Sequence, residues 1–196
     1  MDNNLKIINY LGKNSGQEFT MRKLSMTAGI PYATFHRTMQ EMKDLVKIKT
    51  IGKSKVISLD MNNPVIKSYL VISSEEERKD FLKKQPVINK IAAELTVKDV
   101  VLLFGSYAKG SQRESSDIDL MIINKKGERT ISFSKYEVLF KKKINPIFLS
   151  KKEFIQMLKD PTENIGKQAL KQHIVLNNSE NFWEYVIHGG LQKTVH

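Results

Sequence analysis

The chain of 196 residues contains no cysteine. This absence excludes disulfide bonds, thiolate metal sites and cysteine nucleophiles, and it fits a protein of a reducing compartment. No apolar run approaches the roughly 18 residues that a membrane-spanning helix needs, and the N-terminus has no signal-like pattern. We therefore expect a cytoplasmic protein with no membrane partner.

Acidic residues are fewer than basic ones. The chain has 21 Asp and Glu and 32 Lys and Arg, which gives a formal net charge of +11. Such an excess favours acidic partners, including nucleic acid, without identifying one. Ten basic and five acidic residues lie in the first sixty positions, so the excess is not confined to one end. Internal repeats and low-complexity tracts are also lacking, and the length suits one or two domains.

The most informative segment is the apolar run from Val100 to Phe104, which stops at Gly105. This pattern is typical of a buried strand that leads into a tight turn. If Ser106 to Lys109 open a short helix, their backbone N–H groups have no partners within it, and a phosphate can bind there. Ser106 would add a hydroxyl group and Lys109 a positive charge.

A second apolar run surrounds two aspartates, with Ile118 between them and Leu120 to Ile123 after them. Residues two apart on a strand point the same way, so Asp117 and Asp119 are expected to converge. Two neighbouring carboxylates repel each other unless a cation lies between them, and oxygen ligands near a triphosphate favour Mg²⁺ or Mn²⁺. Paired ions about 3.5 to 4 Å apart can clamp both oxygens of a phosphoryl displacement. The alternative is a strand-turn-helix that merely carries two surface aspartates.

In these residues the chain resembles the minimal nucleotidyltransferases of the DNA polymerase β-like superfamily. The family's pattern of Gly-Ser, ten residues and Asp-x-Asp is matched by Gly105, Ser106, Asp117 and Asp119, and Ser116 also fits. The likeness extends more loosely over residues 96–149. It implies the transfer of a nucleoside monophosphate from a nucleoside triphosphate, with release of pyrophosphate. The implied catalytic and metal-binding residues are Asp117 and Asp119, and the implied nucleotide-binding residues are Gly105, Ser106, Lys109 and Ser116.

One position departs from the family, whose active members present a third carboxylate from a later strand. That strand is expected at Ile144 to Leu149, where Asn145 takes the place of the acid. An amide can coordinate a metal through its carbonyl oxygen, but it brings no charge and cannot act as a base. Glu137 could reach inward from a neighbouring helix, although a solvated helix face is the simpler interpretation. Glu128 in a loop and Glu153 at a helix N-terminus are poorer substitutes.

The first sixty residues predict three helices and a hairpin. The helices are expected over 5–11 with Gly12 as a stop, from the cap Thr20 to Ala28, and from Pro31 to about Leu45; the strands are expected over 46–49 and 55–59. Gly29 would turn the chain between the second and third helices. This arrangement resembles a winged helix-turn-helix domain over Met1 to Asp60.

On such a domain the third helix enters the major groove of DNA and the hairpin lies against phosphates. The candidate base-reading residues are Tyr32, Thr34, His36, Arg37 and Gln40. The candidate phosphate contacts are Lys47, Lys49, Lys53 and Lys55. The alternative is that these lysines keep the domain soluble, and that it mediates dimerisation or the binding of a partner.

We therefore expect an α/β fold in its α+β form with three parts. A winged helix-turn-helix domain spans 1–60, a helical connector spans 61–95, and a nucleotidyltransferase-like mixed sheet flanked by helices spans 96–196. The helices of the last part are expected from Phe133 to Phe140, after a capping box of Ser150 and Glu153, from Ile165 to Leu176, and after the cap Ser179. Trp183 on the last helix is expected in the core.

Two functions remain open from the sequence. The first is an enzyme that uses Mg²⁺ or Mn²⁺ and a nucleoside triphosphate to modify a protein, a nucleic acid end or a small acceptor. The second is a protein that has lost turnover with its third acid and binds nucleotide as a DNA-bound transcriptional regulator or an antitoxin-like partner. The expected partners are a nucleoside triphosphate, DNA, a protein such as a cognate toxin, and a second copy in a homodimer.

Overall fold

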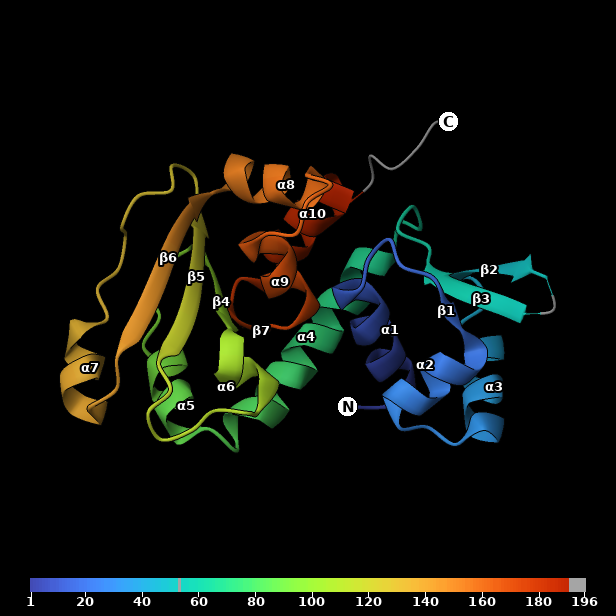
Figure 1. Cartoon of the computed structure of the whole chain (residues 1–196), viewed down its shortest axis with the longest axis horizontal. Coiled ribbons are helices and arrows are strands. Elements are labelled where there is room, and N and C mark those ends of the chain that lie inside the picture. Colours follow the sequence, from blue (N-terminus) through green and yellow to red (C-terminus); the bar gives the residue numbers. More distant parts are fainter. Residues whose placement is uncertain (53, 191–196) are drawn as a thin grey trace. The chain divides into compact units, whose positions relative to one another are not determined.

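The computed structural model describes residues 1–52 and 54–190 and divides the chain into two compact units (Figure 1). The first unit runs from Met1 to Ser73, and the second begins at Ser74. The boundary therefore falls inside one long helix, α4 (Ile66–Leu82), which begins in the first unit and ends in the second. Lys53, a predicted phosphate contact, lies outside the described residues.

Before α4, the described residues of the first unit form three helices and a three-stranded antiparallel sheet in the order β1-β3-β2. Its elements before α4 are α1 (Asn3–Lys13), β1 (Phe19–Thr20), α2 (Met21–Ala28), α3 (Tyr32–Glu41), β2 (Val46–Ile51) and β3 (Ser54–Leu59). The predicted cap of the second helix is confirmed, because the Thr20 hydroxyl accepts a hydrogen bond from the Lys23 N–H at 3.2 Å. Gly29 ends that helix with a φ of 64°, as a turn between two helices requires.

Three details of this unit differ from the sequence-based expectation. The first helix continues through Gly12, its expected stop, and ends at Lys13. The third helix ends at Glu41 rather than near Leu45, because the chain turns there and buries Met42 and Val46 in the core. Strand β1 was not expected, since two residues carry no visible alternation; Phe19 pairs with Ile57 and is buried.

The second unit is built around a mixed four-stranded sheet in the order β6-β5-β4-β7. After α4 its elements are α5 (Pro86–Ala93), β4 (Val100–Phe104), α6 (Gly105–Lys109), β5 (Ile118–Asn124), α7 (Ser134–Phe140), β6 (Ile144–Ser150), α8 (Lys151–Lys159), α9 (Ile165–Lys171), β7 (Ile174–Asn177) and α10 (Ser179–Gly190). Strands β5 and β6 are parallel, and the other two pairs are antiparallel. The expected α+β fold with a mixed sheet flanked by helices is confirmed.

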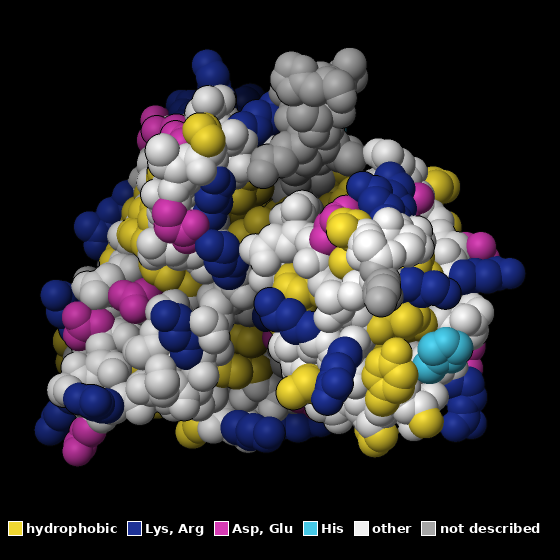
Figure 2. Space-filling view, turned by 45° about the vertical axis from the view of Figure 1, so that its right-hand side comes forward, with side chains coloured by type: hydrophobic (Ala, Val, Ile, Leu, Met, Phe, Trp, Pro, Cys, Tyr) yellow, Lys and Arg dark blue, Asp and Glu magenta, His cyan; other side chains and the backbone are white. Residues whose placement is uncertain are grey.

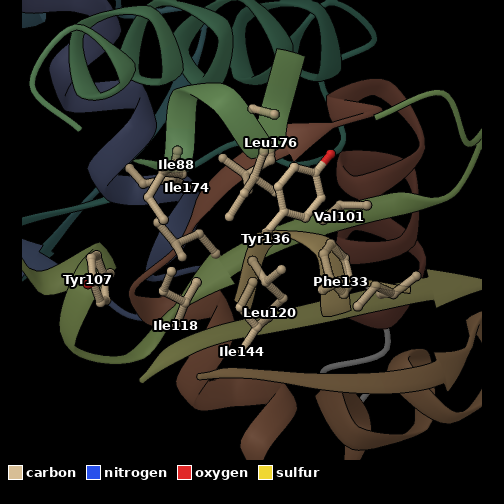
Figure 3. Close-up of a cluster of buried hydrophobic side chains, with 14 residues drawn as sticks. Ile88, Val101, Tyr107, Ile118, Leu120, Phe133, Tyr136, Ile144, Ile174 and Leu176 are labelled. Carbon is tan, nitrogen blue, oxygen red and sulfur yellow. The ribbon is translucent and has the colours of Figure 1, made fainter. Parts of the chain in front are cut away.

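One face of this sheet packs against α5 and α7 (Figure 3). Val101 and Leu120 point from neighbouring strands toward Ile88 of α5 and Tyr136 of α7, and all four side chains are buried. Tyr107 of α6 belongs to the same cluster and anchors the short helix that follows β4. The packing fixes where β4 ends and where β5 begins, and thereby positions the turn and the two aspartates.

The other face of the sheet packs against the C-terminal helices. Phe154 of α8 and Trp183 of α10 both contact Phe182, with ring centroids 6.1 and 5.0 Å away. Trp183 is fully buried, as predicted, and its indole N–H donates to the Ser74 hydroxyl at 2.8 Å. Because both faces of the sheet are covered here, β4 and the segment Leu120 to Ile123 of β5 are continuous apolar runs without alternation.

Two expectations for the C-terminal segment were wrong. The helix predicted from Ile165 to Leu176 ends at Lys171, and Ile174 to Asn177 instead form strand β7 along β4. The predicted cap Ser179 is the first residue of α10; Asn178 caps this helix, since its side-chain oxygen accepts from the Asn181 N–H at 3.3 Å. In the described part of the chain, no helix is both long and apolar enough to cross a membrane.

Candidate active site

The turn after β4 brings the backbone of Gly105 against the side chain of Asp119. Gly105 has a φ of 69°, a conformation that side-chain-bearing residues rarely adopt. A Cβ atom built on Gly105 would lie 2.2 Å from Oδ2 of Asp119. Only glycine therefore allows both this turn and the close approach of the carboxylate.

Strand β5 presents the two aspartates on one side, as their spacing predicts. Asp117 lies directly before Ile118, the first residue of the strand, and Asp119 is the second strand residue. In the sheet Asp119 is paired with Phe104 of β4 on one side and with Asn145 of β6 on the other. The site is thus a row across three neighbouring strands, at the end of β4 and the beginnings of β5 and β6.

Asn145 connects the two carboxylates. Its Nδ2 group donates to Oδ2 of Asp117 at 3.1 Å and to Oδ1 of Asp119 at 3.4 Å. Both aspartates therefore turn one oxygen toward the same amide nitrogen. These contacts show that the carboxylates converge on a point where a positive group is favoured.

Lys143, which the sequence analysis missed, also belongs to this charge cluster. Its Nζ lies 3.6 Å from Oδ2 of Asp117, and its side chain is mostly exposed. The one signal in the sequence was its position two residues before Asn145, within a run of three lysines that otherwise suggests a solvated loop.

The remaining predicted nucleotide-binding residues form no hydrogen bond or ion pair with the two aspartates in the described part of the chain. Ser106 follows Gly105 in the first turn of α6 and is partly exposed, whereas Lys109 is the exposed last residue of that helix. The Ser116 hydroxyl accepts a hydrogen bond from the Arg113 N–H at 2.8 Å, and so stabilises the loop that leads to Asp117. Gly105, Asp117, Asp119 and Asn145 are therefore the residues that the structure brings into direct proximity.

The three glutamates weighed as a third acid each have a partner other than Asp117, Asp119 and the Asn145 side chain. Glu137 accepts the Ile144 N–H at 2.9 Å, Glu153 closes the predicted capping box with Ser150, and Glu128 lies 3.8 Å from Lys126. Among residues 1–52 and 54–190, no group of three His, Cys, Asp or Glu side chains is placed to hold a metal ion. The side chains that converge at this site are two carboxylates and one amide.

Comparison with protein families identifies this region. Residues 86–181 match the family model described as Polymerase beta, Nucleotidyltransferase. This part of the chain is similar to nucleotidyltransferases of that family, and the match contains every element from α5 to β7 and with them the whole aspartate site. Comparisons with curated proteins and with solved structures gave no match.

The predicted DNA contacts lie in the first unit, on α3 and the β2–β3 hairpin. Tyr32, His36, Arg37 and Gln40 are exposed and Thr34 is partly exposed, whereas Phe35 turns into the core. The hairpin lysines differ in their ion pairs. Lys47 pairs with Asp60 at 2.9 Å, and Lys49 pairs with Glu18 at 3.1 Å. Lys55 is exposed and forms no ion pair with a described residue.

Proposed function

We propose that the nucleotidyltransferase-like domain binds a nucleoside triphosphate with a divalent cation, Mg²⁺ or Mn²⁺, and transfers the nucleoside monophosphate to an acceptor. The observation that carries the proposal is the convergence of Asp117 and Asp119 on one point beside the Gly105 turn. Oxygen ligands of this kind favour hard divalent cations. The acceptor is a hydroxyl group of a protein, a nucleic acid end or a small molecule.

The residues present fit such a cation. The two carboxylates carry two negative charges, and the amide that links them can present its oxygen instead of its nitrogen after rotation of the Asn145 side chain. Gly105 lacks the Cβ that would collide with Oδ2 of Asp119, so the carboxylate can lie against the turn. Ser106, the next residue, offers its hydroxyl to a phosphate of the nucleotide.

The proposed transfer forms one bond and breaks one. The acceptor oxygen bonds to the α-phosphorus, the bond from that phosphorus to the bridging oxygen breaks, and pyrophosphate leaves with the bonding electron pair. The acceptor proton passes to water, because the Asn145 amide cannot accept it. A bound divalent cation neutralises charge on the phosphates during this step.

Titration calorimetry with a non-hydrolysable triphosphate, in the presence and absence of Mg²⁺, tests the site. We expect metal-assisted binding that Asp117→Asn or Asp119→Asn weakens at least about tenfold, roughly 1.4 kcal/mol or more. Glu163→Gln, which removes an exposed carboxylate from the same domain, is the matched control and should bind as the native protein does. If no common triphosphate shows metal-assisted affinity, the proposal is wrong.

Asn145 favours a second candidate function, in which nucleotide is bound but not transferred. The position opposite Asp119 in the sheet holds an amide that can neither carry charge nor take a proton. The protein would then act as a nucleotide-sensing transcriptional regulator or as an antitoxin-like partner of a toxin. Pyrophosphate release separates the two functions, because a sensor binds the triphosphate and leaves it intact.

We also propose that the first unit is a winged helix-turn-helix domain that binds DNA through α3 and the hairpin. The support is the exposed face of α3 together with Lys55. We expect Arg37→Ala and Lys55→Ala each to weaken DNA binding, measured by fluorescence anisotropy, and to lower its dependence on salt. Lys6→Ala removes an exposed cation from α1 as a control. Equal effects of all three substitutions would contradict the proposal.

A further inference from the structure

A pocket lies in the nucleotidyltransferase-like domain, away from the aspartates. It has a volume of about 580 Å³ and lies along α8, next to the end of β5. Four of its lining residues are lysines, namely Lys125, Lys151, Lys152 and Lys159, and Tyr185 of α10 completes the wall. Its volume lies within the range of small-molecule sites, which is about 300 to 1,000 Å³.

Three of the four lysines have no acidic partner among the described residues. Lys151 lies 3.6 Å from Glu184 and over the Tyr185 ring, with 4.7 Å from its Nζ to the ring centroid. Lys125, Lys152 and Lys159 are exposed and form no ion pair with any described residue. Like charges gathered around one pocket repel each other, so a bound anion would lower the electrostatic energy of this wall.

The helix geometry keeps these lysines together. Lys151, Ile155 and Lys159 recur at intervals of four on α8, so they share one face of the helix. Ile155 contributes an apolar surface between the charges. Lys125 follows the last residue of β5 and reaches the pocket from the sheet.

The pocket is separate from the aspartate site because β5 and β6 run in parallel between them. Asp119 pairs with Asn145 near the beginnings of the two strands, and Asn124 pairs with Ser150 at their ends. At about 3.3 Å per residue, the six steps from Asp119 to Lys125 span roughly 20 Å. A single nucleotide held by the aspartates is therefore too far away to be the ligand of these lysines.

We propose that this lysine pocket is a second anion site, which binds a ligand carrying several linked phosphate groups. Two sources share this chemistry, namely the backbone of a single-stranded nucleic acid and a small polyphosphate. Several ammonium groups around an open pocket suit several phosphates, and a partly exposed aromatic ring beside them suits either source. The proposal is independent of metal binding at the aspartates.

The test uses the full chain with EDTA present, so that no divalent cation supports the aspartate site. The probes are inorganic tripolyphosphate, followed by calorimetry, and a short oligothymidylate, followed by anisotropy. Lys152→Glu/Lys159→Glu should weaken binding of a probe about tenfold or more. Lys84→Glu/Lys98→Glu is the charge-matched control, since both lysines are exposed in the same domain and form no ion pair with described residues.

The comparison of probes identifies the source. A selective loss for oligothymidylate supports a nucleic acid strand, a selective loss for tripolyphosphate supports a small polyphosphate, and a loss for both supports the shared chemistry. Lys125→Glu, which alters the side of the pocket next to the sheet, should also weaken binding of the probe. Equal losses in pocket and control variants, or no binding of either probe, would overturn the proposal.

Discussion

At the scale of single residues, the geometry of the candidate site demands glycine at position 105. We expect Gly105→Ala to lower the free energy of unfolding by more than the roughly 1 to 2 kcal/mol that a left-handed backbone costs. The added Cβ would displace the Asp119 carboxylate, which lies 2.2 Å from its position, and metal-assisted nucleotide binding should weaken as well. Urea denaturation and calorimetry measure the two effects.

Gly110→Ala is the matched control for this substitution. Gly110 has the same φ of 69°, but nothing lies within 4 Å of its added Cβ. The difference between the two variants therefore isolates the contact with Asp119 from the backbone strain. Equal losses of stability and of nucleotide affinity in both variants would contradict the role assigned to Gly105.

Asn145 is a neutral side chain between two carboxylates. Asn145→Asp should lower the thermal stability of the metal-free protein and raise its affinity for metal. Without metal, three neighbouring carboxylates repel one another, so the thermal midpoint should fall. With Mn²⁺, the added charged ligand should raise metal affinity about tenfold, as measured by electron paramagnetic resonance. Asn145→Ala removes the same hydrogen bonds without adding charge, and it should not bind Mn²⁺ more tightly. An unchanged Mn²⁺ affinity in Asn145→Asp would show that this position does not face the cation.

The central residues of the candidate site were predictable from the sequence because their geometry is local. A glycine after an apolar run and two aspartates at a spacing of two constrain the backbone over a few residues. The pairing of Asn145 with Asp119 was also within reach, since two parallel strands place their beginnings together. Lys143 was not, because a lysine in a basic run carries no signal of which carboxylate lies nearby.

At the scale of elements, helix α8 depends on its capping box. The Ser150 hydroxyl accepts from the Glu153 N–H at 3.2 Å, and the Glu153 carboxylate accepts from the Ser150 N–H at 2.7 Å. Ser150→Ala should lower the stability by about 0.5 to 2 kcal/mol, in line with the loss of an N-cap. Ser150→Asn, which retains a side-chain acceptor, should recover most of the loss in thermal unfolding. A variant series without this recovery would rule out the cap as the cause.

A second prediction concerns Glu94, which follows α5 and links it to α7. Hydrogen bonds from Lys135, Lys90 and Tyr136 lower the pKa of Glu94 from its ordinary value of 4.5 to about 2. A carboxyl group whose pKa falls on folding stabilises the protein above its unfolded pKa, and this contribution disappears as the pH falls from 4.5 toward 2.

Glu94→Gln should therefore lower the thermal midpoint at pH 7, and the difference from the native protein should shrink as the pH falls through that window. Glu163→Gln, at an exposed acid paired with Lys171, should leave the pH profile nearly unchanged. A midpoint difference for Glu94→Gln that is constant between pH 7 and pH 2 would exclude the ionised carboxylate as its source.

Most elements could be predicted from local patterns, and the exceptions have a common physical cause. Residues 174–176 continue a helical pattern in the sequence. In the structure all three are buried in β7, the edge strand that pairs with β4. The third helix likewise ends early because Met42 and Val46 enter the core of the first unit. In both cases packing against residues distant in the sequence outweighs local propensity, which a single sequence does not reveal.

At the scale of the whole molecule, the charge is distributed over both units. Lys and Arg side chains are spread across the visible face and are more widespread than acidic ones (Figure 2). The net charge of +11 thus favours polyanionic partners without singling out one unit. Overall charge alone cannot separate DNA binding by the first unit from phosphate binding by the second, so specific substitutions are needed.

The two proposed activities rest on different residues, and each should be lost without the other. Asp119→Asn should weaken Mg²⁺-assisted binding of a triphosphate about tenfold or more and leave DNA affinity unchanged at every salt concentration. Arg37→Ala should do the reverse, because its exposed guanidinium lies on α3 in the other unit. Calorimetry for the nucleotide and anisotropy for DNA, on the same preparations, give both readouts. One substitution that impairs both activities in a folded protein would contradict the assignment of separate sites.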